Sequence, residues 1–475
     1  MVRVFNHWFS GRKAAFFIAE ESALVLALLA GMSLGPVAHP LVTREHGLGA
    51  AFLRAAIAAL AFAGALYFGD LYDLRSAASD RFDGRRLLRA LGVAVVVLAI
   101  AYLLLPVIVP MGWIPRRSLV LAAAGGALSV IAVRAAMPAV VGAPSRVLML
   151  GTGARAHQLA RELETEADGL FEVAGFADPS GASHAPHPVL PSIGSEAVRV
   201  AISASCEPVD QMARRLKAEV VVVAVEERRA GLPVDALLAC RTCGVRVMSD
   251  VAVAEATLKR IPLDLLRLSA LIFDEGFRAG PVTRAVKRLL DLGLAVTMLL
   301  VAAPAMLLTA AAIALSDGRP VLYSQERTGR GGRAYRIWKF RTMRRDAEAA
   351  GAAWATERDP RVLAVGRVLR RTRLDELPQL WNVLRGEMSF VGPRPERPVF
   401  LEELKRRWPL FALRELVKPG LTGWAQLKYR YGSTMEEQAR KLEYDLYYIK
   451  NTSLFLDLVC LFHTAKIVLT GKGAK

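Results

Sequence analysis

Long apolar runs alternate with short polar segments over the first third of the chain. Four of these runs are each about 20 residues long or more, which is enough to cross a bilayer core of about 30 Å as a helix. They are Ala14–Ala38, Gly49–Phe68, Ala90–Met111 and Leu119–Val141. Residues 1–145 are therefore predicted to form four transmembrane helices.

Basic residues between the runs indicate how these helices are oriented. Arg3 and Arg12 precede the first run, and the arginine-rich segment 75–89 separates the second from the third, whereas the loop at 40–48 has only Arg44. Basic loops remain on the cytoplasmic side of a membrane. The N-terminus and residue 145 are therefore both predicted to be cytoplasmic, although Arg116 in the third loop weighs against this orientation.

After residue 145 the pattern changes to short buried strands separated by amphipathic helices, which is typical of an α/β domain. Residues 146–275 are predicted to form this soluble domain. Its first strand ends at a glycine turn, a helix follows at His157–Glu166, and further strands are expected at Phe171–Ala177, Glu219–Val225 and Val245–Met248.

The glycine turn, Gly151-x-Gly153-x-x-Ala156, is a partial dinucleotide-binding fingerprint of a Rossmann-like domain. Backbone amides in such a turn hold a pyrophosphate at the start of a helix, and an acid follows about 20 residues later. Glu172 and Asp178 are both candidates for that acid. The same spacing also occurs where a strand simply packs tightly against a helix, so both interpretations stay open.

A fifth apolar run, Leu289–Leu315, is interrupted by Pro304 and has basic residues on both flanks, among them Arg288 and Arg319. A spanning helix here would place the rest of the chain outside the cell if residue 145 is cytoplasmic. Proline within a helix removes a hydrogen bond and kinks the chain. Residues 276–320 are therefore predicted to be a linker and a re-entrant helix that enters and leaves the membrane on one face, with its break at Pro304.

Residues 321–475 have the mixed pattern of a further α/β unit. Two strands are expected around a glycine turn, loop is expected from Met388 onward, and amphipathic helices follow. The strands are Val321–Arg327 and Ala334–Arg341, and the helices are Phe400–Trp408, Met435–Ile449 and Leu454–Leu469. Two alternatives remain for these helices: they lie in the membrane interface, or they pack on the core of their own domain.

Composition narrows the class of protein. Apolar residues make up 53% of the chain, and the net charge is +18. With membrane segments present, this positive charge indicates membrane lipids and phosphorylated substrates rather than nucleic acid. The cysteines form no disulfide framework, and the pair Cys240-x-x-Cys243 has no second pair to complete a zinc site.

Two adjacent acids, Asp375 and Glu376, lie between clusters of arginines. The arginines are Arg370, Arg371, Arg373, Arg394 and Arg397. Adjacent carboxylates need cations or a metal to remain ionised, and arginine binds phosphate in a bidentate manner. The pattern indicates phosphoryl transfer, with one carboxylate as nucleophile and the other as a Mg²⁺ ligand. The structural alternative is a solvated pair of acids in the first turn of a helix.

Five motifs in order carry a specific resemblance. They read KFRTM, LDELPQ, NVLRGEMS, GPRP and PGLTG, at Lys339–Met343, Leu374–Gln379, Asn382–Ser389, Gly392–Pro395 and Pro419–Gly423. Together they resemble the bacterial sugar transferase family, the monotopic phosphoglycosyl transferases. Two departures, Arg373 where many members have serine and Trp424 after the last motif, leave the acid pair itself intact.

The resemblance implies an enzyme of the bacterial inner membrane, with its mixed α/β monotopic catalytic domain on the cytoplasmic face. The implied reaction transfers a hexose 1-phosphate from a UDP-sugar to undecaprenyl phosphate and releases UMP, which begins exopolysaccharide or O-antigen repeat units. It also implies the re-entrant helix, with Asp291 as an acid near its start, and a homodimer.

The resemblance also assigns roles to individual residues. It implies that Asp375 forms an aspartyl–phosphosugar intermediate and that Glu376 binds Mg²⁺. Asp445 matches a further acid that holds the metal or orders an arginine. The implied substrate-binding residues are Lys339, Arg341, Arg370, Arg394 and Arg430.

Two other functions are compatible with parts of the sequence. A membrane-anchored, NAD-dependent nucleotide-sugar dehydratase or epimerase needs a Tyr-x-x-x-Lys pair, and Tyr335 and Lys339 have that spacing. This pair, however, lies far beyond the glycine turn and inside a strand-like run. The second alternative is a non-enzymatic scaffold of a polysaccharide assembly system, which does not require the acid pair and the arginines together.

Overall fold

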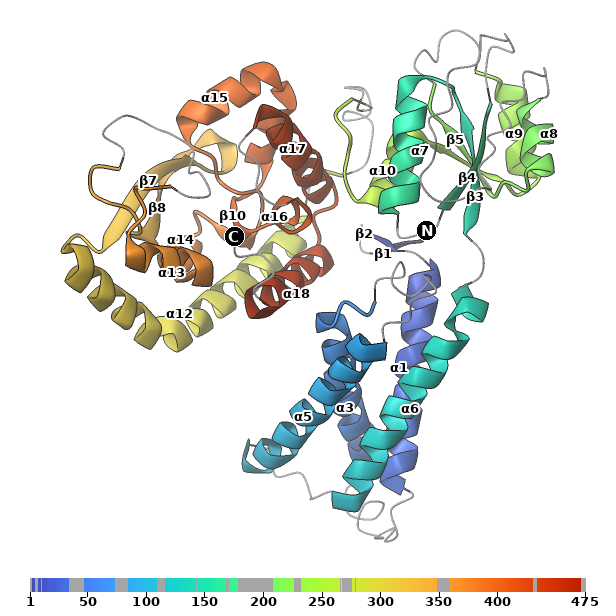
Figure 1. Cartoon of the computed structure of the whole chain (residues 1–475). Helices are drawn as coiled ribbons and strands as arrows, with labels where there is room; N and C mark the ends of the chain where they lie inside the picture. The colour runs from blue at the N-terminus through green and yellow to red at the C-terminus, as the bar shows by residue number, and fades with distance from the viewer. Residues whose placement is uncertain are drawn as a thin grey trace. The chain divides into compact units, whose positions relative to one another are not determined.

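The computed structural model describes most of the chain, with gaps between the helices and in several loops. The described residues are 2–4, 7–9, 11–33, 47–72, 84–108, 116–141, 144–167, 171–177, 208–225, 232–264, 266, 276–277, 279–347, 359–429 and 434–470. They form two compact units, one containing Phe9–Leu258 and the other containing Lys259–Lys475 (Figure 1). A short pair of strands, β1 (Val2–Val4) and β2 (His7–Phe9), opens the chain.

Four long helices coincide with the four apolar runs of the N-terminal region. They are α1 (Gly11–Ser33), α3 (Gly47–Phe68), α5 (Gly84–Ile108) and α6 (Arg116–Val141). Leu24, Phe62 and Val130 lie in their shared core, while leucines such as Leu60 and Leu88 point outward at 70% and 73% exposure. In the described part of this region, Ala14–Gly31 is long and apolar enough to cross a membrane, and Ala55–Phe68 and Val120–Ala136 are shorter apolar segments.

The α/β domain has a four-stranded parallel sheet in the order β4-β3-β5-β6. Its strands are β3 (Ser145–Leu150), β4 (Phe171–Ala177), β5 (Val220–Val223) and β6 (Arg246–Ser249). Alternate residues of β3 face two separate cores, because helices cover both sides of the sheet. These are α7 (Ala154–Glu166) and α10 (Asp250–Leu258) on one side, and α8 (Val209–Arg215) and α9 (Val234–Thr242) on the other. The predicted strands and the α/β class are confirmed.

The glycine turn at the end of β3 is explained by packing. Gly151 has a φ of +128°, and a Cβ on it would lie 2.6 Å from the carbonyl oxygen of Ala224. Only glycine fits so close to the backbone after β5. Of the two candidate acids, Glu172 lies in β4 with its carboxylate 3.8 Å from Arg146, and Asp178 lies outside the described residues.

The second unit begins directly after α10 and includes the segment at 259–264. Arg260 is 1% exposed, and its Nη1 donates to the Glu443 carboxylate at 2.6 Å. The indole of Trp424, one of the two departures from the family motifs, donates to the carbonyl oxygen of Lys259 at 2.9 Å. This segment is therefore part of the core of the second unit.

Around that core, short sheets and helices surround the acid pair. The strands are β7 (Leu322–Thr328), β8 (Ala334–Phe340), β9 (Ser389–Val391) and β10 (Gly420–Thr422). The α-helices are α12 (Pro281–Asp317), α13 (Ala364–Thr372), α14 (Leu380–Arg385), α15 (Pro398–Arg407), α16 (Trp424–Lys428), α17 (Met435–Lys450) and α18 (Leu454–Thr470). Three 3₁₀ helices complete it: η1 (Arg330–Gly332), η2 (Leu374–Gln379) and η3 (Pro409–Leu416).

The strands and helices predicted in this unit are present, but one expectation was wrong. The chain after Met388 is not all loop, because β9 pairs in parallel with β10, joining Ser389 to Gly420. The partners are distant in sequence and are flanked by glycine and proline, so no local pattern marks them. Helix α17 packs on the domain core, since its residues from Leu442 to Lys450 are all buried.

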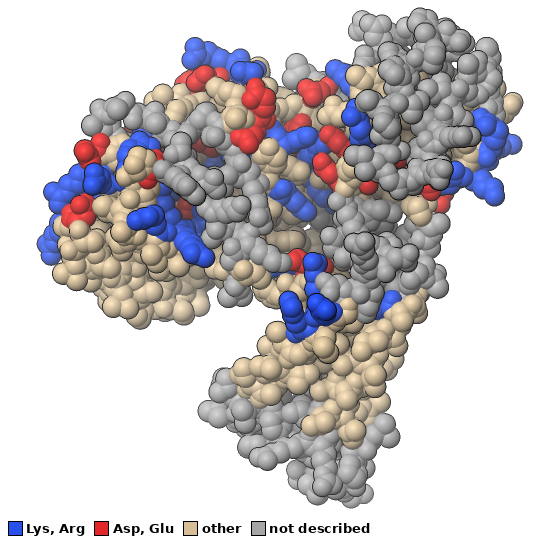
Figure 2. Space-filling view, in the orientation of Figure 1, with Lys and Arg blue, Asp and Glu red and all other residues tan. Residues whose placement is uncertain are grey.

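Helix α12 is a single helix of 37 residues that continues through Pro304 and bends near its middle (Figure 1). Proline is the usual cause of such a bend, because it removes one backbone hydrogen bond. The helix exposes large apolar side chains along its length, including Leu300 at 72% and Leu308 at 73%. Figure 2 shows the surface over α12, on the face in view, without acidic or basic side chains.

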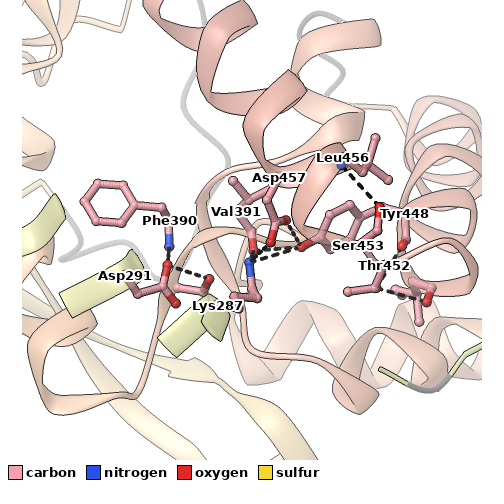
Figure 3. A network of polar contacts seen from close by, with 11 residues as sticks. Lys287, Asp291, Phe390, Val391, Tyr448, Thr452, Ser453, Leu456 and Asp457 are labelled. Carbon is pink, nitrogen blue, oxygen red and sulfur yellow. Dashed lines mark hydrogen bonds and ion pairs between the residues drawn. The ribbon is translucent and has the colours of Figure 1, made fainter. Parts of the chain in front are cut away.

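Polar contacts fix the start of α12 to β9 (Figure 3). The buried Asp291 carboxylate accepts from the Ser389 hydroxyl at 3.1 Å and from the Phe390 amide at 3.0 Å. Lys287 donates to Asp457 of α18 at 2.7 Å and to the carbonyl of Val391 at 3.1 Å. Because β9 runs directly into the GPRP motif, these contacts position that loop relative to the apolar helix.

Removing the Asp291 carboxylate should destabilise the second unit. In Asp291→Ala the Phe390 amide loses its buried acceptor, which costs about 1–3 kcal/mol. Thermal unfolding in detergent is expected to show a lower melting temperature than wild type, whereas Asp264→Ala, at an exposed position, should match wild type. An unchanged melting temperature in Asp291→Ala would contradict the anchoring role.

Candidate active site

Both acids of the central motif lie in η2, at the point where the chain turns out of α13. Arg373 ends α13 in the left-handed conformation, with a φ of 58°, and Pro378 lies within the following 3₁₀ turns. The acids do occupy a first helical turn, as the structural alternative expects. They are not solvated, however, because Asp375 is only 8% exposed and the Glu376 side chain only 17%.

Three cations surround one oxygen of Glu376. Its Oε1 lies 3.4 Å from Lys339 Nζ, 3.2 Å from Arg394 Nη2 and 4.0 Å from Arg373 Nη1. Burial acts to raise the pKa of Glu376, but the charges of Lys339, Arg394 and Arg373 outweigh it and lower the pKa to about 2. Glu376 is therefore ionised throughout the physiological range.

Asp375 has the opposite environment. Burial, and then the negative charge of Glu376, raise the pKa of Asp375 to about 6, against the opposing charges of Lys339 and Arg370. Its Oδ1 is buried and accepts no hydrogen bond from the residues that the structure describes. A carboxylate that is ionised at pH 7 and carries an oxygen without a donor is suited to attack an electrophile.

A cleft beside the acid pair is lined by three cations and an amide. These are Arg327 of β7, Lys339 of β8, Arg394 of the GPRP motif and Gln379 of η2, with Ile337, Pro395 and Gly420 completing the wall. Within the described ranges, the Gln379 amide nitrogen is buried without a hydrogen-bond acceptor. Several cations and a free donor form a site for the oxygens of phosphate groups.

Two other predicted substrate-binding residues contact protein groups. Arg370 donates from Nε to the Thr342 hydroxyl at 2.9 Å, and its charge opposes the rise in the pKa of Asp375. Arg341 is 6% exposed and donates to the carbonyls of Asp317 and Gly318 at 2.9 and 2.7 Å. Arg341 therefore fixes the end of β8 to the end of α12. The remaining predicted substrate-binding residue, Arg430, lies outside the described residues.

Asp445 holds an arginine. Its carboxylate lies 2.9 Å from Nε of Arg414, and Arg414 Nη2 donates to the carbonyl of Arg394 at 2.7 Å. Of the two roles that the resemblance implies for Asp445, this geometry fits the ordering of an arginine. Through Arg414, Asp445 therefore supports the backbone of Arg394, whose side chain contacts Glu376.

The acid pair is compatible with a bound Mg²⁺. Among the described residues, no three His, Cys, Asp or Glu side chains gather as a preformed metal site. Mg²⁺, however, is usually held by one or two carboxylates together with substrate phosphates and waters. All three cations near Glu376 contact Oε1, so Glu376 Oε2 is the oxygen that fits such a metal. Asp375 Oδ1, which accepts no hydrogen bond from the described part of the chain, is then left available as a nucleophile.

The sequence did not single out several residues of this site. Arg327 and Gln379 line the cleft, and Arg414 supports the Arg394 loop. Arg373 was named among the arginines beside the acid pair, but its contact with Glu376 was not predicted. Gln379 was marked in the sequence, because it is the last residue of the LDELPQ motif. Arg327 and Arg414 were not marked, since their contacts depend on strand pairing and on long-range packing.

The chain belongs to the bacterial sugar transferase family. The family model for bacterial sugar transferases matches residues 282–471, which covers α12 and the acid pair. A glucose-1-phosphate transferase from Caulobacter vibrioides, named for UDP-glucose and undecaprenyl phosphate, is 40% identical over 201 residues, which are 41% of this chain and 75% of that protein.

Two larger relatives are named for different sugars. An N-acetylgalactosaminephosphotransferase of Aeromonas hydrophila, named for UDP-N-acetylgalactosamine and undecaprenyl phosphate, is 39% identical over 239 residues, which are 50% of this chain and 56% of that protein. The UDP-glucose:undecaprenyl-phosphate glucose-1-phosphate transferase of Escherichia coli K12 is 42% identical over 195 residues, which are 41% of this chain and 42% of that protein. The chain therefore matches about half the length of these two relatives.

Proposed function

We propose that this protein is a phosphoglycosyl transferase that moves a hexose 1-phosphate from a UDP-sugar to undecaprenyl phosphate. One observation carries the proposal: Asp375, with a buried oxygen that accepts no hydrogen bond among the described residues, lies next to a Glu376 held by three cations. The relatives named above support the acceptor and the class of donor. Because they are named for different hexoses, the particular sugar is left to experiment.

In the first half-reaction, Asp375 Oδ1 attacks the β-phosphorus of the UDP-sugar. A bond forms between this oxygen and phosphorus, and the bond from phosphorus to the bridging oxygen breaks, so that UMP leaves with the electron pair. No proton has to be removed, because the Asp375 carboxylate is already the anion at pH 7. Lys339 and Arg394, which line the cleft, would balance the charge that develops on the departing phosphate.

In the second half-reaction, an oxyanion of undecaprenyl phosphate attacks the same phosphorus. The Asp375–phosphorus bond breaks, the carboxylate is regenerated, and undecaprenyl-diphospho-sugar is released. When bound at the acid pair, Mg²⁺ would supply charge neutralisation for the diphosphate. Two displacements through one covalent enzyme give ping-pong kinetics.

The membrane arrangement is part of the same proposal. The bend of α12 at Pro304, its exposed apolar surface and the basic residues at both ends support a re-entrant helix that keeps the active site on the cytoplasmic face. The four N-terminal helices would span the bacterial inner membrane. Single cysteines introduced before and after α12 test this arrangement. They are treated in intact cells with a thiol reagent that does not cross the membrane. A re-entrant helix leaves both cysteines on the cytoplasmic face, where this reagent does not reach them.

The direct test of the reaction is a screen of donors with purified full-length protein, Mg²⁺ and undecaprenyl phosphate in nanodiscs. UDP-glucose, UDP-galactose and their N-acetylated forms are each assayed for UMP release. The proposal predicts UMP from at least one of them, in amounts that depend on undecaprenyl phosphate. Release of UDP instead of UMP, or turnover that does not depend on the lipid, would contradict it.

The dehydratase alternative is disfavoured by where Tyr335 and Lys339 lie. Both are on β8, where four residues span about 13 Å, whereas the same spacing on a helix would bring the two side chains together. Tyr335→Phe is therefore expected to keep UMP release within about threefold of wild type, because the Tyr335 hydroxyl makes no hydrogen bond to the described residues. Complete loss of UMP release in Tyr335→Phe, with normal folding, would revive an acid–base role for Tyr335.

A further inference from the structure

Two cations converge on one point of the backbone beside the start of α12. A Cβ built on Gly386 would lie 3.3 Å from Nη2 of Arg288 and 3.4 Å from Nζ of Lys418. Gly386 follows α14 with a φ of 80°, in the left-handed region that favours glycine. The guanidinium of Arg288 and the ammonium of Lys418 therefore lie close to each other, and a side chain at position 386 would crowd both.

The positive charge of this pair is not cancelled by a contacting carboxylate. Arg288 donates to the carbonyls of Val383 and Leu384, at 2.6 and 2.7 Å, which are neutral acceptors. Lys418 is half-buried and makes no hydrogen bond or ion pair with the residues that the structure describes. Burial, and then the charge of Arg288, lower the pKa of Lys418, while the nearby Asp291 opposes this and is itself bonded to Ser389 and Phe390.

A partly buried cation without an anion is unfavourable unless a ligand supplies the negative charge. Exposed lysines near a membrane need no such explanation, because water solvates them. Lys418 differs because it is half-buried and because the charges of Arg288, Arg330 and Lys287 all act on it. The pair therefore has the properties of an anion-binding site.

The position of the pair indicates which anion would reach it. Arg288 is followed directly by Leu289 and Leu290, which are 69% and 42% exposed and begin the apolar surface of α12. Lys418 precedes Gly420 by two residues, and Gly420 lines the cleft at the acid pair. Arg288 thus lies where the apolar surface of α12 begins, and Lys418 lies two residues before a residue that lines the cleft.

We propose that Lys418 and Arg288 bind the phosphate group of a membrane lipid at the entrance to the active site. The negative charge could come from the undecaprenyl phosphate acceptor, an identification that rests on the proposed function, or from the headgroup of an anionic phospholipid. The first source makes the pair an acceptor site. The second makes it a contact that seats the catalytic unit on the membrane.

Lipid retention separates these outcomes without requiring turnover. Full-length wild type, Lys418→Gln and the control Arg406→Gln, at an exposed position of α15, are purified in phospholipid-free detergent. Undecaprenyl phosphate or phosphatidylglycerol is then added, and bound lipid is counted by native mass spectrometry. Lys418→Gln is expected to retain about tenfold less of one of these two lipids than either wild type or Arg406→Gln retains. The lipid whose retention falls is the one that supplies the phosphate group to the site.

Retention of both lipids at the wild-type level by folded Lys418→Gln would overturn the proposal. If Lys418→Gln does not fold, Lys418→Arg is measured in its place. This variant keeps the positive charge and is expected to retain lipid like wild type. Loss of lipid retention in folded Lys418→Arg would also contradict a simple phosphate contact. In the acceptor case, the KM for undecaprenyl phosphate rises while the KM for the UDP-sugar stays unchanged. Lipid binding is counted directly and does not depend on turnover. A wild-type protein that binds lipid but releases no UMP would therefore refute the proposed reaction without contradicting the proposed lipid site.

Discussion

Asp375→Asn is expected to lower the rate of UMP release by at least about a thousandfold, because removal of a covalent nucleophile leaves only binding and electrostatic assistance. Asparagine has nearly the same shape as aspartate, so the packing of the buried side chain is preserved. The measurement is the initial rate of UMP release with the preferred UDP-sugar, together with the melting temperature of each protein.

The matched control is Asp264→Asn, which makes the same chemical change at an exposed position of the second unit. It should release UMP at the wild-type rate. Asp375→Asn with activity near wild type would remove Asp375 from the mechanism, and the acid pair would then need another role.

Glu376→Gln is expected to lower the rate on the order of a hundredfold, the typical effect of removing one preorganised charge from an active site. Lys339, Arg394 and Arg373 would lose the carboxylate oxygen that they share. The glutamine would also be a poorer Mg²⁺ ligand, so the concentration of Mg²⁺ needed for half-maximal rate should rise. A variant with wild-type rate and Mg²⁺ dependence would show that the charge of Glu376 is dispensable.

The pH profile adds an independent check of the pair. In wild type, UMP release should fall as the pH drops through about 6, because protonation removes the nucleophilic anion of Asp375. Glu376 is one of the causes that raise the pKa of Asp375. The acid limb of Glu376→Gln should therefore move to lower pH, and a shift to higher pH would contradict the coupling of the two carboxylates.

The two acids occupy consecutive positions yet have different electrostatic environments. Cations lie against Glu376 and hold it ionised, whereas Asp375 is buried beside that negative charge. Environments that shift two carboxylates in opposite directions divide their roles. In the proposed mechanism, Glu376 is the permanent charge that organises the cleft, and Asp375 is the group that reacts.

Much of the fold followed from local patterns. The four N-terminal helices and the strands of the parallel sheet matched their predicted positions, because each is marked by a mostly apolar run of its own. The hairpin of β7 and β8 is marked instead by the glycine turn between the two strands. The pairing of β9 with β10 did not follow, since each strand is three residues long and is stabilised by a distant partner.

The sequence predicted which residues would form the candidate site, but it did not predict all of their contacts. Resemblance to the family motifs pointed to Asp375 and Glu376 as the acid pair. In the structure, Lys339 and Arg394 both contact the carboxylate of Glu376. Sequence alone did not show that Arg341 donates to the end of α12, or that the Asp445 carboxylate contacts Arg414. Those contacts join residues far apart in the chain, and the direction of each side chain is set by tertiary packing.

The central claim is that Asp375 becomes covalently bonded to the phosphosugar, and the intact mass of the protein tests this most directly. Wild type is incubated with the preferred UDP-sugar and Mg²⁺ in the absence of undecaprenyl phosphate, quenched, and weighed by mass spectrometry. We predict a mass increase of one phosphosugar, located on the peptide that contains Asp375, absent from Asp375→Asn and removed when undecaprenyl phosphate is added. An enzyme that turns over with acceptor but never gains this mass, or gains it on another residue, would contradict the account.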